Sequence, residues 1–128
     1  MSPTYFAPVL VALALMAAPA ESAGLLQGEY RPLTSRETVD IGERFGGQVV
    51  LVVNTASKCG LTPQYEGLEA LHQRYSPRGF AVLGFPSGDF MGQEFEDEAE
   101  IAEFCTNTYG VQFPMFQRVH VRGDAAIP

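Results

Sequence analysis

The sequence predicts an α/β fold built around parallel β-strands. Short β-branched apolar runs alternate with longer segments in which apolar residues recur at helical spacing. Strands joined by helices in this way favour parallel pairing with right-handed crossovers. The 128 residues, 46% of them hydrophobic, are enough for one small domain. The expected order is strand 48–54, helix 63–76, strand 80–85, helix 97–108 and strand 116–121.

The N-terminal segment differs in composition from the rest. An apolar run at 9–18 leads into an Ala-x-Ala pattern that ends at Ala20. We interpret residues 1–20 as a secretory signal peptide and residues 21–128 as the exported, periplasmic domain. The segment before the run has no Lys or Arg, and without a working signal the protein would be cytoplasmic. The run is roughly half the ~20 residues of a spanning helix, so no membrane anchor is expected.

The first long strand follows a polar lead-in. Residues 25–43 are punctuated by glycine, and we expect them to supply a hairpin. The strand then contains the continuous apolar run 49–53. Such a β-branched run favours a strand that is buried on both faces of a parallel sheet, so we expect it to be the central one.

The turn after this strand contains Cys59. Thr62 is expected to cap the following helix and Pro63 to occupy its first position, where a missing N–H is harmless. Free amide donors, the positive end of the helix dipole and the neighbouring Lys58 would then favour the thiolate over the thiol. Reactive cysteines are typical of such helix N-termini, although a free cysteine can also serve as a small buried hydrophobe. The pattern indicates redox chemistry at Cys59.

The first long helix is expected to bury one face. That face consists of Tyr65, Leu68, Leu71 and Tyr75. His72 falls outside it and is expected in solvent. Neither His72 nor His120 has metal-ligand spacing with a cysteine, so we expect no metal site and no cofactor.

The second long helix carries Cys105. Asp97 and Glu100 make a cap-like pair at its start. Ile101, Phe104 and Cys105 fall on one apolar face, which by itself indicates core packing of the cysteine. The acidic residues at its start are expected to be solvated; they are Glu94, Glu96, Asp97, Glu98 and Glu100.

Four segments resemble signatures of the glutathione peroxidase family. They are 54–69 around the cysteine turn, 79–86 over the second strand, 90–94 and 109–116. They occur in order, at family-like spacing, and together cover about residues 48 to 123. This resemblance implies a thioredoxin-like α/β fold, in which helices flank a central mixed sheet.

The resemblance also implies a thiol peroxidase. The family's nucleophile, here Cys59, attacks the terminal oxygen of hydrogen peroxide or an organic hydroperoxide and becomes a sulfenic acid. Gln93 matches the family's active-site glutamine, whose amide can hydrogen-bond the thiolate and the peroxide; without the resemblance it would be interpreted as a solvated loop residue. Cys105 matches the resolving cysteine of thioredoxin-linked members, and from a buried helix it could reach Cys59 only if that helix opened. The implied role is oxidative stress defence.

Charge restricts the partners of the protein. The formal net charge of −7 argues against nucleic acid and against anionic membrane surfaces. Basic residues are scattered rather than clustered, so a thioredoxin-like dithiol donor is favoured over glutathione, which is an anion. We expect a monomer.

The sequence departs from the family pattern at several positions. Ser87 stands where members often have a further cysteine, and Glu94-Phe95-Glu96 replaces the usual Glu-Pro-Gly. In the family, a tryptophan and an asparagine complete an active-site tetrad with the residues that match Cys59 and Gln93. Both fall beyond residue 128, and so do the family's last strand and helix. We therefore expect an incomplete domain with an open sheet edge. The alternatives to a peroxidase are a catalytically impaired redox switch or interaction protein, and an inactive fragment.

Overall fold

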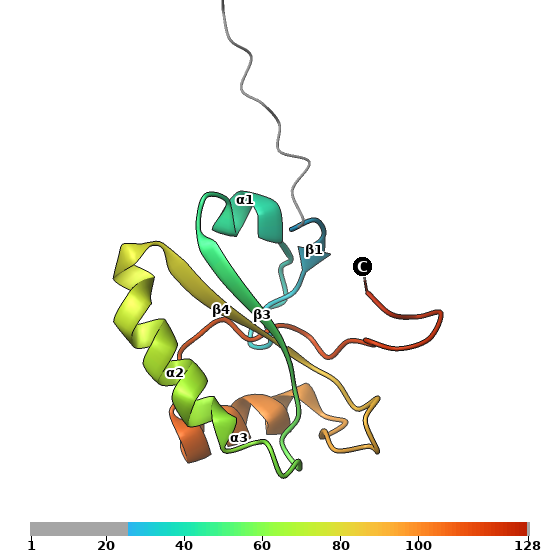
Figure 1. Cartoon of the computed structure of the whole chain (residues 1–128). Helices are drawn as coiled ribbons and strands as arrows, with labels where there is room; N and C mark the ends of the chain where they lie inside the picture. The colour runs from blue at the N-terminus through green and yellow to red at the C-terminus, as the bar shows by residue number, and fades with distance from the viewer. Residues whose placement is uncertain (1–25, 128) are drawn as a thin grey trace, which may run out of the picture.

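The computed structural model describes residues 26–127, so the proposed signal peptide lies outside the described residues. Figure 1 shows a small α/β unit in which one long strand pair is surrounded by helices and loops. Within the described residues, no helix is long and apolar enough to cross a membrane. The elements in chain order are β1 Glu29–Tyr30, β2 Val39–Asp40, α1 Ile41–Phe45, β3 Val49–Thr55, α2 Gln64–Tyr75, the 3₁₀ turn η1 Ser76–Arg78, β4 Phe80–Pro86 and α3 Glu98–Tyr109.

The centre of the fold is the parallel pair formed by β3 and β4. Val49 pairs with Phe80 at one end, and Thr55 pairs with Pro86 at the other. The helix α2 connects the two strands and packs against β4. The predicted strand–helix–strand unit is therefore confirmed.

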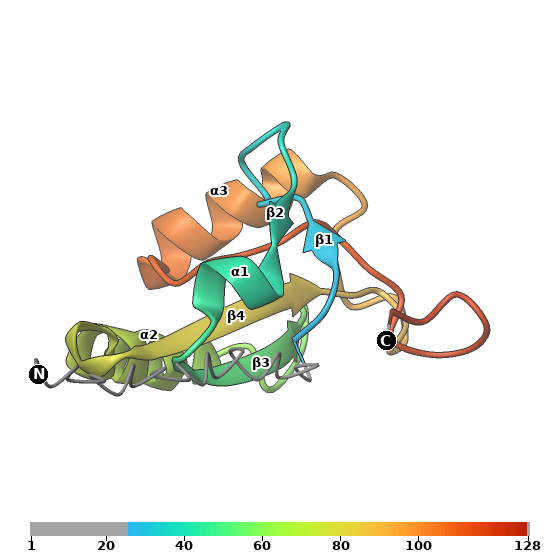
Figure 2. The same ribbon diagram turned by 90° about the horizontal axis from the view of Figure 1, so that it is seen from above.

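Among residues 26–127, the first long strand does not hold the central position expected of it. From Ala81 to Pro86 every residue of β4 is buried, whereas Val49 and Val52 of β3 are 70% and 53% exposed. In Figure 2, β3 lies on the side of β4 away from α3. The reason is that β4 has neighbours at both edges, while β3 pairs only with β4 among residues 26–127. An apolar run shows that a segment suits a strand, but not which neighbours it will have.

The predicted strand 116–121 does not form as a continuous strand. The segment makes two isolated bridges, a parallel one between Met115 and Gly84 and an antiparallel one between Phe116 and Pro32. Its backbone divides its hydrogen bonds between two partners: Phe116 N–H donates to Gly84 O at 2.9 Å, and Gln117 N–H donates to Arg31 O at 2.8 Å. On the β4 side Pro86 has no N–H to continue the ladder, and on the other side Arg31 N–H donates to the Gln117 side chain at 2.9 Å, so each side keeps a single bridge.

The predicted hairpin in the lead-in is present. β1 and β2 pair antiparallel, with Glu29 opposite Asp40. Asp40 also caps α1, a short helix that the sequence analysis did not predict, because its side chain accepts a hydrogen bond from Glu43 N–H at 2.7 Å. Ile41 and Phe45 anchor α1 in the core.

Buried side chains form two clusters, one on each face of β4. Ala81, Leu83 and Phe85 belong to one cluster and Val82 to the other, because successive strand residues point to opposite faces. The first cluster is completed by Tyr30, Ile41, Phe45, Phe116 and Val119. The second is completed by Leu33, Tyr65, Ile101, Cys105 and Phe113. Tyr65 of α2 and Cys105 of α3 thus pack in the same cluster on one face of β4.

The buried face of α2 differs from the prediction. Tyr65 is buried, but Leu71 is 41% exposed. In its place Glu69 is buried, because its carboxylate accepts hydrogen bonds from Gln112 and Phe113 N–H at 2.7 and 3.2 Å. His72 is half-buried rather than solvated, with Nδ1 accepting from a β4 amide at 3.4 Å. Polar groups occupy this face because unpaired backbone groups beneath the helix need partners.

The start of α3 confirms one prediction and corrects another. Asp97 caps the helix, accepting a hydrogen bond from Ala99 N–H at 2.7 Å. The acidic run is not simply solvated, because Glu94 is only 2% exposed and Glu98 forms an ion pair with Arg31. The expected inner residues Ile101 and Cys105 are both buried.

Candidate active site

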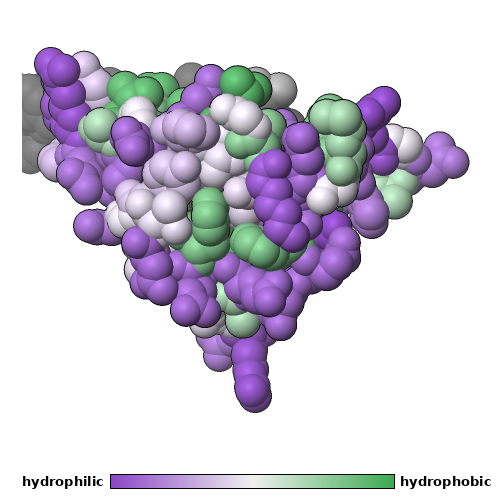
Figure 3. Space-filling view, turned by 90° about the horizontal axis from the view of Figure 1, so that it is seen from below, coloured by the Kyte–Doolittle hydropathy of each residue, from purple (hydrophilic) through white to green (hydrophobic). Residues whose placement is uncertain are grey.

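A pocket of about 330 Å³ opens where β3 ends and α2 begins. Both Cys59 and Gln93 line it, together with Asn54, Thr55 and Tyr65. Its remaining wall is mostly apolar and includes Val53, Ala56, Leu61, Leu68 and Phe90. Figure 3 shows the molecule from below, where apolar residues surface in small patches between polar ones. The structure therefore brings together Cys59 and Gln93, two residues far apart in sequence.

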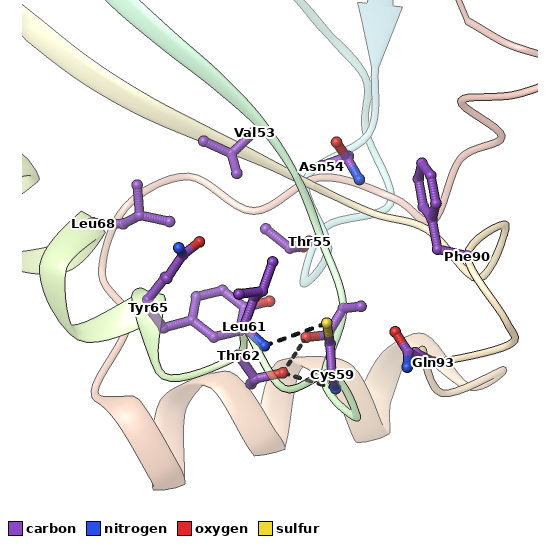
Figure 4. Close-up of a pocket in the computed structure, with 12 residues that line it drawn as sticks. Val53, Asn54, Thr55, Cys59, Leu61, Thr62, Tyr65, Leu68, Phe90 and Gln93 are labelled. Atoms are coloured by element: carbon purple, nitrogen blue, oxygen red, sulfur yellow. Dashed lines mark hydrogen bonds between the residues drawn. The ribbon is translucent and has the colours of Figure 1, made fainter.

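Hydrogen bonds fix the backbone around Cys59. The sulfur is half-buried and accepts a hydrogen bond from Leu61 N–H at 3.4 Å. Cys59 N–H donates to Thr62 Oγ1 at 3.0 Å, and the same hydroxyl donates to Ala56 O at 2.8 Å (Figure 4). Thr62 thus ties both sides of the turn together.

The helix after Cys59 begins later than the sequence suggests. Thr62 does not cap it, and Pro63 occupies the cap position without a side-chain hydrogen bond, so that α2 starts at Gln64. The predicted cap residue instead stabilises the cysteine turn, because its hydroxyl is already engaged there. The N–H donor at the sulfur therefore comes from Leu61, in the turn itself.

Lys58 contacts an aromatic ring next to the turn. Its Nζ lies 4.0 Å from the centroid of the Phe95 ring, a cation–π contact. Its backbone N–H donates to Gln93 O at 2.8 Å. Lys58 therefore links the cysteine turn to the loop that carries Gln93.

The loop of Gln93 has an unusual backbone. Met91 adopts φ 56°, in the left-handed region that non-glycine residues rarely occupy, and Gly92 follows with φ 64°. Gly92 N–H donates to Gly88 O at 3.0 Å and Gln93 N–H to Phe90 O at 3.2 Å. This tight turn presents the Gln93 side chain to the pocket (Figure 4).

Glu94 is a site residue that the sequence analysis missed. Its Oε1 accepts hydrogen bonds from Ser57 N–H at 3.1 Å and from Phe95 N–H at 2.9 Å. The carboxylate is buried between the cysteine turn and the glutamine loop. Acidic neighbours in the sequence suggested solvation, and the decisive partner, Ser57, lies 37 positions away.

Cys105 is not part of the pocket lining. It is a free thiol with 2% exposure, held in the α3 side of the core. Burial raises the pKa of the Cys105 thiol, an effect that a neighbouring Tyr65 hydroxyl partly offsets. Burial also raises the pKa of Tyr65, and Cys105 raises it further. Tyr65 both lines the pocket and packs in the cluster of Cys105, so it stands between the two cysteines.

The histidines serve other contacts. His120 Nδ1 lies 2.8 Å from Asp89 Oδ1, and Asp89 Oδ2 accepts from Val121 N–H at 2.8 Å. The hydrogen bond with His120, followed by that from Val121, holds the pKa of Asp89 below its usual value. Among the residues that the structure describes, no three His, Cys, Asp or Glu side chains are grouped to hold a metal ion.

Comparison with known proteins identifies the family. The family model described as glutathione peroxidase matches residues 29–128. The chain belongs to the glutathione peroxidase family. It is 51% identical over 107 residues to a glutathione peroxidase homolog, BsaA, of Halalkalibacterium halodurans, a match that covers 84% of this chain and 62% of that protein. It is 52% identical over 86 residues to the thioredoxin/glutathione peroxidase BtuE of Escherichia coli, covering 67% of this chain and 47% of BtuE.

A solved structure supports the same family and its thioredoxin-like fold. The crystal structure of Trgpx in its apo form matches with a TM-score of 0.59 and 34% identity, over 84% of this chain and 61% of that one. The predicted thioredoxin-like α/β fold is thus confirmed. The chain spans about half to three fifths of the length of these glutathione peroxidase relatives.

Proposed function

We propose that this chain is a thiol peroxidase that reduces hydrogen peroxide or organic hydroperoxides, with Cys59 as the nucleophile. The observation that carries the proposal is the shared pocket of Cys59 and Gln93 at the N-terminal side of α2. Family membership supports the same chemistry, because the relatives are named as peroxidases.

In the first step, the Cys59 sulfur attacks the terminal peroxide oxygen. The S–O bond forms, the O–O bond breaks, and the leaving oxygen takes a proton to depart as water or an alcohol. Leu61 N–H donates to the sulfur and stabilises negative charge there. Gln93 lines the same pocket, and we infer that its amide hydrogen-bonds the peroxide oxygens.

In the second step, the Cys105 sulfur attacks the sulfenic sulfur of Cys59. An S–S bond forms, the S–O bond breaks, and the hydroxyl leaves as water after taking up a proton. Because Cys105 is buried and outside the pocket, this step requires local opening of α3. A thioredoxin-like protein or glutathione then reduces the disulfide, as the name thioredoxin/glutathione peroxidase suggests for the relative BtuE.

The setting of the reaction is also part of the proposal. Residues 1–20 act as a signal peptide, and the mature domain works as a monomer in the periplasm, in oxidative stress defence. If the segment is not cleaved, the protein is cytoplasmic. Mass spectrometry of the purified protein tests this directly, since cleavage leaves Glu21 as the first residue.

Stopped-flow oxidation by one equivalent of hydrogen peroxide, followed by peptide mapping, tests the chemistry. We expect the reduced chain to react orders of magnitude faster than a free thiol and to end in a Cys59–Cys105 disulfide. The Cys105→Ser variant should keep the fast first step and accumulate sulfenic or over-oxidised Cys59. Turnover of that variant with thioredoxin at the parent rate would contradict the resolving role.

A redox switch is the second candidate. It is favoured by one observation, the 2% exposure of Cys105, because a disulfide that waits for α3 to open forms slowly. In this case the same disulfide appears in peptide maps, but Cys59 reacts with peroxide at the rate of a free thiol. The rate of the first step therefore separates the two functions.

A further inference from the structure

Glu94 joins the two loops that make the pocket. Its Oε1 accepts from Ser57 N–H at 3.1 Å, two residues before Cys59, and from Phe95 N–H at 2.9 Å, two residues after Gln93. The adjacent backbone bond from Lys58 N–H to Gln93 O, 2.8 Å, closes the same junction. One carboxylate oxygen thus fixes the spacing of the two loops.

The other oxygen of Glu94 lies in a buried polar region. Glu94 Oε2 has no hydrogen-bond partner among the described residues, and the carboxyl group is 2% exposed. Three hydroxyl groups close to the turn are likewise buried and unpartnered; they belong to Thr55, Ser57 and Tyr65. A carboxylate oxygen only accepts, so a partner for Oε2 has to be a hydrogen-bond donor.

Burial of a carboxylate is unfavourable unless its oxygens are hydrogen-bonded. An apolar side chain at position 94 would pack without that penalty, but it could not accept the amides of Ser57 and Phe95. The position therefore carries a group whose length and acceptor geometry match the gap between the loops.

We propose that Glu94 is the positioning residue of this site, which holds the Cys59 turn and the Gln93 loop at a fixed spacing. It acts through Gln93 and Cys59 and does not touch the peroxide. The proposal rests on the proposed peroxidase function for its kinetic consequence, while its structural consequence is independent of activity.

Two conservative variants separate the effect of side-chain length at position 94 from the effect of its charge. Glu94→Gln keeps the length and one oxygen acceptor but removes the charge, whereas Glu94→Asp keeps the charge but is one methylene too short. We expect Glu94→Asp to slow peroxide oxidation of Cys59 by on the order of 10- to 100-fold, as a misplaced reacting group does. Glu94→Gln should stay within about threefold of the parent. The matched controls are Glu100→Gln and Glu100→Asp, at an exposed position of α3. They should change neither the peroxide oxidation rate of Cys59 nor the amide hydrogen exchange at Ser57 and Phe95.

The experiment is carried out on the full chain with three readouts. The first is the rate at which peroxide oxidises Cys59. The second is the rate at which iodoacetamide alkylates Cys59, a reaction that needs only an accessible sulfur, so this rate should change little. The third is amide hydrogen exchange at Ser57 and Phe95, which should lose protection in Glu94→Asp and keep it in Glu94→Gln. In the Gln93→Ala background, Glu94→Asp should add no further loss of peroxide rate, because coupled residues are not additive.

Several results would overturn the proposal. Equal peroxide rates for the two variants, an additive double variant, or unchanged exchange at Ser57 in Glu94→Asp would each do so. If Glu94→Asp does not unfold cooperatively, the test depends on Glu94→Gln. A parent-like peroxide rate with parent-like amide protection at Ser57 and Phe95 supports the positioning role. A slower peroxide rate with full amide protection contradicts it. If Cys59 of the parent protein reacts with peroxide at the rate of a free thiol, the proposed function is wrong. Amide exchange at Ser57 and Phe95 then still tests whether Glu94 holds the two loops together.

Discussion

The two cysteines of this chain have the same side chain in opposite surroundings. Cys59 lies half-buried in an irregular turn, with a backbone N–H donating to its sulfur at 3.4 Å. Cys105 lies in the middle of α3, 2% exposed and packed in the core, and burial raises the pKa of its thiol. Exposure and local hydrogen bonds, not residue type, therefore distinguish the proposed nucleophile Cys59 from Cys105.

Alkylation rates test whether the two cysteines differ in accessibility. With the reduced full chain and iodoacetamide, we expect Cys105 to react more slowly than Cys59 by on the order of 100-fold or more, because it must wait for opening of α3. A time course of iodoacetamide labelling, followed by peptide mapping, gives the alkylation rates of both cysteines. In urea the two rates should converge, which serves as the control. Equal rates in buffer would show that α3 does not protect its cysteine.

The turn of Cys59 can be weakened without touching the sulfur. Thr62→Val keeps the shape but removes the hydroxyl that accepts from Cys59 N–H and donates to Ala56 O. We expect a loss of about 2 kcal/mol in the free energy of unfolding, because two part-buried backbone groups lose their partner. Urea unfolding measures it, with Thr106→Val at an exposed site of α3 as the control. A loss as small as in the control would mean that the turn does not depend on Thr62.

The pH dependence of stability tests the burial of the Cys105 thiol. Because the pKa of this thiol is raised in the folded state, the unfolded thiol ionises first, at about pH 8.5. Stability should therefore be fully present below that pH and decline as the pH rises toward the folded pKa, by at most about 1.4 kcal/mol per pH unit. Urea unfolding of reduced protein between pH 7 and 9.5 measures this decline.

The control for this pH effect is Cys105→Ser, which has no thiol to ionise at this position. Its free energy of unfolding should fall less steeply over the same range. Tyr65, whose pKa burial also raises, adds its own loss above about pH 10. Parallel curves for parent and Cys105→Ser below pH 9.5 would contradict the assignment of the effect to Cys105.

Part of the candidate site could be predicted from the sequence. The Cys59 turn follows an apolar strand and precedes a helix, and these signals are local, so the sequence analysis placed them. Gln93 was assigned only through family resemblance, since nothing local distinguishes it from a loop residue. Glu94 was misjudged because its burial depends on Ser57, which is distant in the chain. Thr62 was given the wrong role, because a hydroxyl near a helix start has more than one backbone partner within reach.

The strands show the same division. Their existence and parallel pairing followed from apolar runs joined by a helix, and β3 and β4 confirm them. Their order did not follow, because apolar periodicity reports how well a segment suits a strand and not which edges are covered. The segment after α3 illustrates this, since it forms only one bridge to β4 and one to Pro32 instead of a continuous strand.

The α/β class, the cysteine turn, the family and the cap of α3 could be inferred from the sequence, because each depends on residues close together in the chain or on a shared pattern. The folded structure was needed to show that β4 is central among residues 26–127, that Cys59 and Gln93 share a pocket while Cys105 does not, and that Glu94 joins their loops. These features depend on contacts between distant segments. Burial and hydrogen-bond partners arise only when the chain packs, and they set the chemistry of each thiol.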